Sequence, residues 1–170
     1  RSPFAEVGAH RETLQVMAYE PMVLLLAVAY FLATGSFDVE AIIHVPAPII
    51  GSTVGVFIGM LFILTIKLRK SPFDLSYSHH AHQDLVKEMS GRVLGMVDIM
   101  HWCENVLFMA WIALFFVWSS PICIFVVIVA LALVYFLEIW IDNNFARVKW
   151  QLMLKSAWIV TLVFAGINIA

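Results

Sequence analysis

Hydrophobic residues along the chain gather in five runs that short polar segments separate. Each run is close to the roughly 20 residues that a helix needs to cross the hydrocarbon core of a bilayer. Strands of a barrel would alternate apolar and polar residues, which these runs do not do, so helices are the simplest interpretation. We predict one all-α membrane domain over residues 1–170, a bundle of about five transmembrane helices. The expected spans are about residues 14–33, 49–66, 93–118, 122–141 and 152–169.

The composition supports a membrane protein. The 170 residues are 62% hydrophobic and 13% charged, whereas a soluble domain is about 45–50% apolar and about 25% charged. The formal net charge of −2 gives no basic bias toward nucleic acid. We therefore expect a multi-pass protein whose main surroundings are the lipid bilayer.

The positions of Lys and Arg predict the orientation of the helices. All ten of them precede the first run, separate the second from the third, or lie between the fourth and fifth runs or just inside the fifth. Residues 35–48 and 119–121, which join the other runs, contain neither Lys nor Arg. Because positive residues stay on the cytoplasmic side, we expect the amino end and loop 67–92 to be cytoplasmic and the carboxyl end to lie outside.

Three glycines in the second run are spaced four residues apart: Gly51, Gly55 and Gly59. Such a repeat places small residues on one side of a helix, which allows another helix backbone to approach closely. Helix packing is the leading interpretation, and glycines that line a cavity are the alternative.

The third run contains three ionisable residues at intervals of three: Asp98, His101 and Glu104. This spacing keeps them on one stripe of a helix. Two carboxylates that flank an imidazole could relay protons, because each group can accept and release a proton near neutral pH. The alternative is a set of paired structural charges at a subunit contact.

Two further acids lie within the runs. Glu20 is followed by Pro21, which favours a kink where water could reach the carboxylate. Glu138 lies one helical turn before Asp142, near the expected cytoplasmic boundary, so an interfacial position is equally compatible with the pattern. Ionisable groups inside a membrane are functional candidates, and we include Glu20 and Glu138 in a predicted proton or ion pathway.

The longest polar segment, residues 70–87, is expected to face water or a protein partner. We predict a docking surface there for a cytoplasmic partner. Adjacent histidines rarely bind one ion together, and Cys103 and Cys123 fall in apolar runs without a C-x-x-C motif, so no metal site is expected. The residues of this predicted docking loop are Asp74, His79, His80, His82, Gln83 and Asp84.

Several motifs carry a family resemblance. Tyr19-Glu-Pro-Met and Ser71-Pro-Phe-Asp-Leu resemble the membrane subunit of respiratory complex I that forms the quinone chamber. The histidine form of the loop, His79-His-Ala-His-Gln-Asp-Leu-Val, is similar to the homologous subunit of energy-converting, Ech-type membrane-bound nickel–iron hydrogenases, as are His101-Trp-Cys-Glu-Asn and Asp142-Asn-Asn-Phe-Ala-Arg. Members are longer at the amino end, so the resemblance implies the carboxyl-terminal part of a longer subunit.

The resemblance to the hydrogenase subunit implies a coupling role in a prokaryotic cell membrane. Hydrogenase large and small subunits, which carry iron–sulfur clusters and the nickel–iron centre, would dock on the loops and receive electrons from ferredoxin. Hydrogen evolution would then drive H⁺ or Na⁺ through antiporter-like membrane subunits, and this chain would hold no cofactor and no catalytic residue. Two alternatives are a quinone-chamber subunit of a complex I-type NADH:quinone oxidoreductase and a passive membrane anchor. The acids that match family positions are Glu20, Asp74, Asp98 and Glu104.

Overall fold

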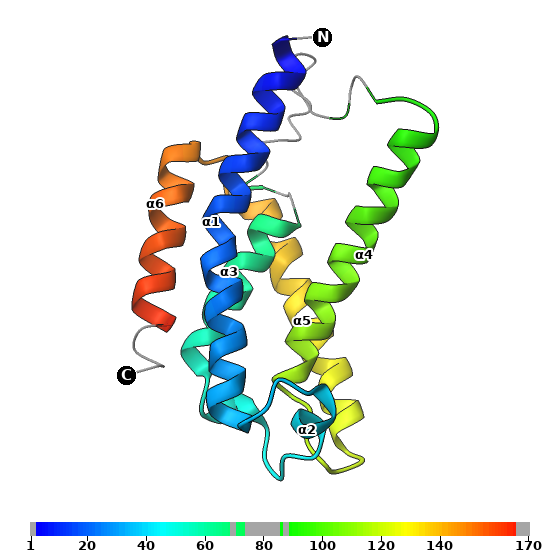
Figure 1. Ribbon diagram of the computed structural model, residues 1–170, viewed down its shortest axis with the longest axis vertical. Helices are drawn as coiled ribbons and strands as arrows, with labels where there is room; N and C mark the ends of the chain where they lie inside the picture. The colour runs from blue at the N-terminus through cyan, green and yellow to red at the C-terminus, as the bar shows by residue number, and fades with distance from the viewer. Residues whose placement is uncertain (1–2, 69–70, 74–85, 87–88, 166–170) are drawn as a thin grey trace.

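The computed structural model describes residues 3–68, 71–73, 86 and 89–165, and within them all regular structure is helical (Figure 1). The prediction of an all-α bundle is therefore confirmed. The elements are α1 (Pro3–Thr34), α2 (Val39–Ile43), the 3₁₀ turn η1 (Ile49–Gly51), α3 (Val54–Lys67), α4 (Arg92–Leu114), α5 (Cys123–Asn144), α6 (Trp150–Val160) and the π-helical turn η2 (Thr161–Ala165).

Among the described residues, three helices are long and apolar enough to cross a membrane: α1, α4 and α5. Two of the five predicted spans form shorter apolar helices, in α3 and in Trp150–Phe164. The 14 residues of α3 extend about 21 Å, which is less than the roughly 30 Å hydrocarbon core. The residues of the predicted span 49–66 divide into the turn η1 and helix α3. Between them the Thr53 hydroxyl donates to the Ile49 carbonyl at 2.9 Å.

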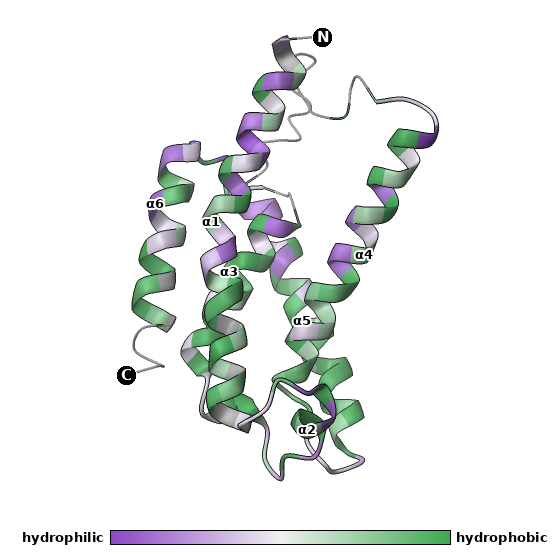
Figure 2. Cartoon of the chain, in the orientation of Figure 1, coloured by the Kyte–Doolittle hydropathy of each residue, from purple (hydrophilic) through white to green (hydrophobic). Residues whose placement is uncertain are grey.

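Helix α1 begins well before the first hydrophobic run. Its 32 residues extend about 48 Å, and Figure 2 shows polar residues concentrated on its first half. The predicted span of about residues 14–33 lies inside this longer helix, because charged residues do not interrupt a helix and it extends beyond the apolar run. The helix ends before Gly35, whose φ of 71° is favourable for glycine and closes the last turn.

Helix α3 lies at the centre of the bundle. Helices α1 and α6 pack on it, and α4 packs on it as well as on α5. The main core joins Met22 of α1, Ile63 and Leu64 of α3, and Ile112 and Phe115 at the end of α4, all at most 2% exposed. These contacts hold the carboxyl-terminal half of α4 on the bundle, while α4 has no buried residue before Phe108.

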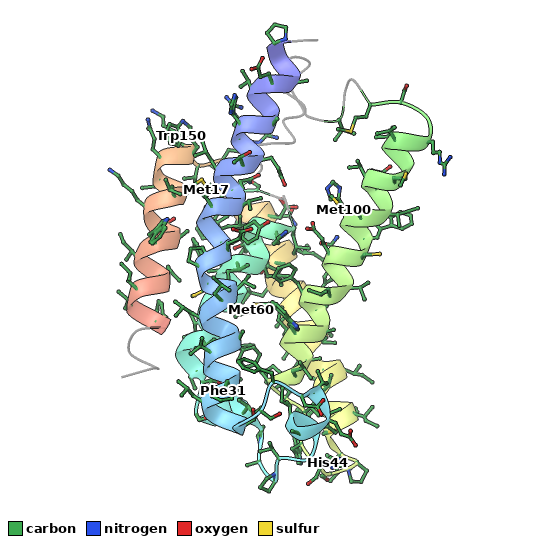
Figure 3. All side chains as sticks on the ribbon, in the orientation of Figure 1. Met17, Phe31, His44, Met60, Met100 and Trp150 are labelled. Atoms are coloured by element: carbon green, nitrogen blue, oxygen red, sulfur yellow. The ribbon has the colours of Figure 1, made fainter. Side chains whose placement is uncertain are left out.

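The loops alternate between the two ends of the bundle. The start of α1, the end of α3, the start of α4 and the α5–α6 connection lie at one end, and α2 lies at the other with the α4–α5 turn (Figure 1). Trp150 and His44 mark the two ends in Figure 3. This alternation is the one that the Lys and Arg distribution predicts, and which end is cytoplasmic stays a prediction.

The glycines of the second run occupy different surroundings. Gly59 is buried in α3 against α1, where an added Cβ would overlap the Met22 methyl group. Gly55 is half-buried one turn earlier. Gly51 lies in η1 with open space beside it, so it does not share a face of α3 with the other two.

Larger side chains at Gly59 are expected to destabilise the α1–α3 contact. Overpacking a filled core costs about 1–3 kcal/mol, so Gly59→Leu should lower the thermal midpoint of the detergent-solubilised protein more than Gly59→Ala does. Adding Met22→Ala to Gly59→Leu should recover part of the loss by vacating the space. Gly51→Leu is the control, and an equal loss from that variant would contradict the assignment of the contact to Gly59.

Candidate functional site

An ion pair joins the end of α3 to the middle of α4. Lys67 Nζ lies 2.8 Å from Glu104 Oε1, and the two side chains are 8% and 31% exposed. Lys67 is the last residue of α3, so its long side chain can turn back along the helix end toward α4. The cation therefore lies within the bundle rather than in the loop that follows it.

Aromatic rings complete the surroundings of the cation. Lys67 Nζ lies 4.3 Å from the centroid of the Tyr19 ring on α1 and 5.4 Å from that of Phe108 on α4. Cations within about 6 Å of such rings are attracted to the face of the π-system. Three helices thus converge on one ammonium group, and we call Tyr19, Lys67, Glu104 and Phe108 the ion-pair site.

This arrangement holds a pair of opposite charges among three helices. A partly buried ion pair gains little net stability over apolar residues of similar size, whereas removing one partner is strongly destabilising. Charges inside membrane bundles are functional candidates for the same reason.

Only one member of the predicted Asp98–His101–Glu104 relay lies in the ion-pair site. Glu104 is half-buried there, His101 is half-buried one turn earlier, and Asp98 is exposed. The stripe turns away from the bundle toward the start of α4, where the helix separates from its neighbours (Figure 1). The described residues therefore bring Glu104 together with Lys67 rather than with Asp98.

The remaining predicted pathway acids, Glu20 and Glu138, lie in different surroundings. Glu20 is exposed on α1, and the helix continues through Pro21. It is Tyr19, its neighbour, that faces the bundle. Glu138 is 3% exposed on α5 and shares a buried stripe with Ala130 and Val134, so its side chain faces the interior of the bundle.

A second cluster fixes the start of the polar loop. We call Ser71–Phe73 the loop base. The Gln15 side chain, which is 2% exposed, donates from Nε2 to the Phe73 carbonyl at 2.6 Å. The Ser71 amide donates to Asp142 Oδ1 at 2.9 Å. Phe73 is also part of a small core with Ala18, Ile66, Met153 and Ala157.

The connection between α5 and α6 adds two more bonds to the loop base. The Ser71 hydroxyl donates to the Phe145 carbonyl at 2.9 Å, and the Val148 amide donates to the Pro72 carbonyl at 3.0 Å. The loop base is thus held by α1, by the end of α5 and by residues that lead into α6. Lys67 lies only four residues before it in the chain.

Sequence reasoning missed Tyr19, Lys67 and Phe108 of the ion-pair site, and also the buried Gln15. Lys67 was counted only as a loop charge, and Gln15 was unnoticed although a polar residue in an apolar run, four before Tyr19, is a usable signal. The predicted docking residues Asp74, His79, His80, His82, Gln83 and Asp84 lie outside the described residues. In the part that is described, no three His, Cys, Asp or Glu side chains form a potential metal site.

The fold and the two clusters define a multi-pass helical membrane protein with a charged site among its helices. The chain matches the family model described as NADH dehydrogenase over residues 1–170, and it belongs to this family of complex I-like membrane subunits. The resemblance to complex I is therefore confirmed at the level of the family, and with it a membrane complex as the setting of this chain. Comparison with curated proteins found no match.

Tyr19 provides a graded test of the ion-pair site. Tyr19→Phe keeps the ring and removes the hydroxyl, whereas Tyr19→Leu removes both. Since a desolvated cation–π contact contributes up to about 2 kcal/mol, the Leu variant should lower the thermal midpoint of the purified protein clearly more than the Phe variant. Glu20→Gln, at the exposed neighbouring position, is the control. Equal effects of Phe and Leu would show that the ring does not support the cation.

Proposed function

We propose that this chain is the membrane coupling subunit of an energy-converting nickel–iron hydrogenase. It would dock the large and small hydrogenase subunits on its polar loop and link ferredoxin-dependent hydrogen evolution to the movement of H⁺ or Na⁺. The observation that carries the coupling role is the ion pair between Lys67 and Glu104, four residues before the base of the loop on which the partner would bind.

The proposed coupling works through the short connection from the loop base to Lys67. A docked partner that changes its charge during electron transfer would pull on the loop base, which only residues 68–70 separate from Lys67 in the chain. The ammonium group, 2.8 Å from Glu104, balances the charge of the carboxylate. In the proposed cycle, separation of the pair would leave that charge unbalanced inside the bundle, a proton would take the place of the ammonium group, and renewed pairing would displace it.

The path of that proton beyond Glu104 is part of the same proposal. Glu138 is buried in α5, whereas His101 is half-buried one turn from Glu104. These groups would hand protons toward antiporter-like membrane subunits. Asp98 and Glu20, both exposed in this chain, would meet neighbouring subunits rather than one another.

The histidine-containing loop supports the hydrogenase branch over the quinone branch. Histidines stand here where the complex I form of the loop is rich in glutamate, and residues 74–85 are the segment on which the soluble module would bind. Nickel and iron–sulfur centres would then belong to the partner subunits.

Purification of the intact membrane complex in mild detergent tests this assignment. Nickel and iron in the preparation, with hydrogen evolution that depends on reduced ferredoxin, is the expected result. A complex with bound quinone and flavin but without nickel would overturn the hydrogenase assignment, and the coupling role of the ion-pair site would then be tested on quinone reduction.

A quinone-chamber subunit is the second candidate, which the family match favours. The family model is described as NADH dehydrogenase. In this second candidate an apolar quinone would lie beside the loop, and the spans around the ion-pair site would form the walls of its chamber. Co-purified quinone, together with NADH-dependent quinone reduction, would support this candidate.

A further inference from the structure

An apolar groove lies beside the loop base, between α3, α5 and α6. Its volume is about 530 Å³, within the roughly 300–1,000 Å³ typical of ligand pockets. The walls include Phe62 and Thr65 of α3, Trp140 of α5, Leu152 and Ser156 of α6, and Phe73. These side chains offer carbon surface with few polar groups, so an occupant should be largely hydrocarbon.

The groove is short and lies at one end of the bundle. On α6 its lining residues, Leu152 and Ser156, are about 6 Å apart along the axis. On α5 it is lined by Trp140 and Ile141, in the last turn of the helix. A transmembrane helix would need a groove of about 30 Å. The available length suits the part of an acyl chain next to its headgroup.

The charges beside the groove favour an anionic headgroup. Arg147 and Lys149 lie between α5 and α6 and Lys155 lies on α6, while the nearby Asp142 carboxylate accepts the Ser71 amide. Lys149 is exposed and follows Val148, which lines the groove. Trp140 and Trp150 are 53% and 41% exposed at the same end, and tryptophan is enriched at the level of lipid headgroups.

We propose that this groove binds one anionic phospholipid, with an acyl chain along Phe62, Leu152 and Ser156 and the phosphate beside Lys149. Clusters of cations between helices are recognised features of sites for acidic lipids. Because Pro72 and Phe73 form part of the wall, the bound chain packs against the loop base. The inference does not depend on the hydrogenase assignment.

Native mass spectrometry of the intact complex tests this site. The complex is exchanged into nanodiscs that contain equal amounts of phosphatidylglycerol and phosphatidylcholine, and the retained lipids are counted. We expect one retained phosphatidylglycerol per copy of this chain. Lys149→Gln should reduce its enrichment roughly fivefold, since each cation near a membrane surface favours anionic lipid by about that factor. Arg92→Gln, at the same end of the bundle on α4, should leave it unchanged.

A second variant tests the hydrocarbon part of the site. Ser156→Trp fills the groove and should remove the retained lipid of either kind. If that variant does not assemble, photoreactive phosphatidylglycerol in the wild-type complex should label peptides that contain Trp140 or Leu152. Unchanged lipid counts in Ser156→Trp, equal retention of both lipids, or labelling confined to other helices would overturn the proposal. So would crosslinking of Ser156→Cys to another subunit, which would show a protein contact there.

Discussion

Glu104→Gln is expected to abolish ion translocation by the intact complex while electron transfer remains measurable. Glutamine keeps the size of the side chain and removes its negative charge and the carboxylate oxygen to which a proton could bind. In the proposed cycle the carboxylate that pairs with Lys67 at 2.8 Å is the group that changes charge. Its replacement by an amide should therefore be enough to uncouple ion translocation from electron transfer. The measurement is ion uptake into inverted vesicles beside hydrogen evolution, on the same preparation.

The same substitution should also lower stability, so a second variant must separate the two effects. An unpartnered cation at a buried position costs about 3–5 kcal/mol, and the Tyr19 and Phe108 rings offset about 0.5–2 kcal/mol of it. In the double variant Lys67→Met with Glu104→Leu no charge is left unpaired. This protein should recover the thermal midpoint of the wild type and still fail to move ions.

Asp98→Asn is the matched control for Glu104→Gln. Asp98 is on the same helix and exposed, so its substitution should affect translocation less if the ion-pair site is central. Intact translocation in Glu104→Gln would rule out the coupling role and leave a passive membrane anchor as the better description. Loss of translocation in Asp98→Asn alone would instead assign the coupling role to a group near the start of α4.

The sequence was sufficient for the bundle and for its alternation. A lipid environment requires long apolar runs and keeps Lys and Arg in the loops on one side of the membrane. Both patterns can be recognised from short stretches of the sequence. The boundaries of α1 and α3 were less predictable, because helices can continue beyond an apolar run, as α1 does toward Pro3, or begin after a turn, as at Thr53. Burial of Gly59 against Met22 followed the G-x-x-x-G spacing, whereas Gly51 lies outside α3.

The clusters were harder to predict than the helices. Glu104 was identified because an acid in an apolar run is conspicuous, but its partner Lys67 is 37 residues earlier and was read as a loop charge. Spacing within one helix favoured Asp98 and His101 as partners of Glu104. The rotation of α1 and of α3 about their own axes decides which of their residues face Glu104. Packing of the whole core sets this rotation, so a local sequence pattern does not predict it.

The loop base is bonded to three parts of the bundle. It receives bonds from Gln15, Asp142 and the Phe145–Val148 segment, and it precedes the predicted docking residues in the chain. Because Ser71–Phe73 are bonded to three parts of the bundle, this loop can transmit a force, whereas a loop tethered only by its ends cannot. We therefore expect binding of the soluble partner to depend on these bonds as well as on the histidines.

Asp142→Ala should weaken binding of the soluble module by roughly tenfold or more. The carboxylate accepts the Ser71 amide at 2.9 Å, and a hydrogen bond to a charged group contributes about 1.5–3 kcal/mol, which corresponds to roughly a 10- to 100-fold change in an equilibrium. The loss is local to the loop base, because the core of α3 and α4 does not use Asp142. The measurement is the ratio of soluble subunits to this chain after affinity purification through a tag on the chain.

Asp142→Asn separates the hydrogen bond from the charge. Asparagine retains Oδ1 as an acceptor for the Ser71 amide, so its purification ratio should stay within a few-fold of the wild type. Gln15→Ala, which frees the Phe73 carbonyl from a different helix, should resemble Asp142→Ala. Full retention of the soluble module in both alanine variants would show that the loop base does not position the docking surface. An equal loss in Asp142→Asn would instead assign the effect to the negative charge.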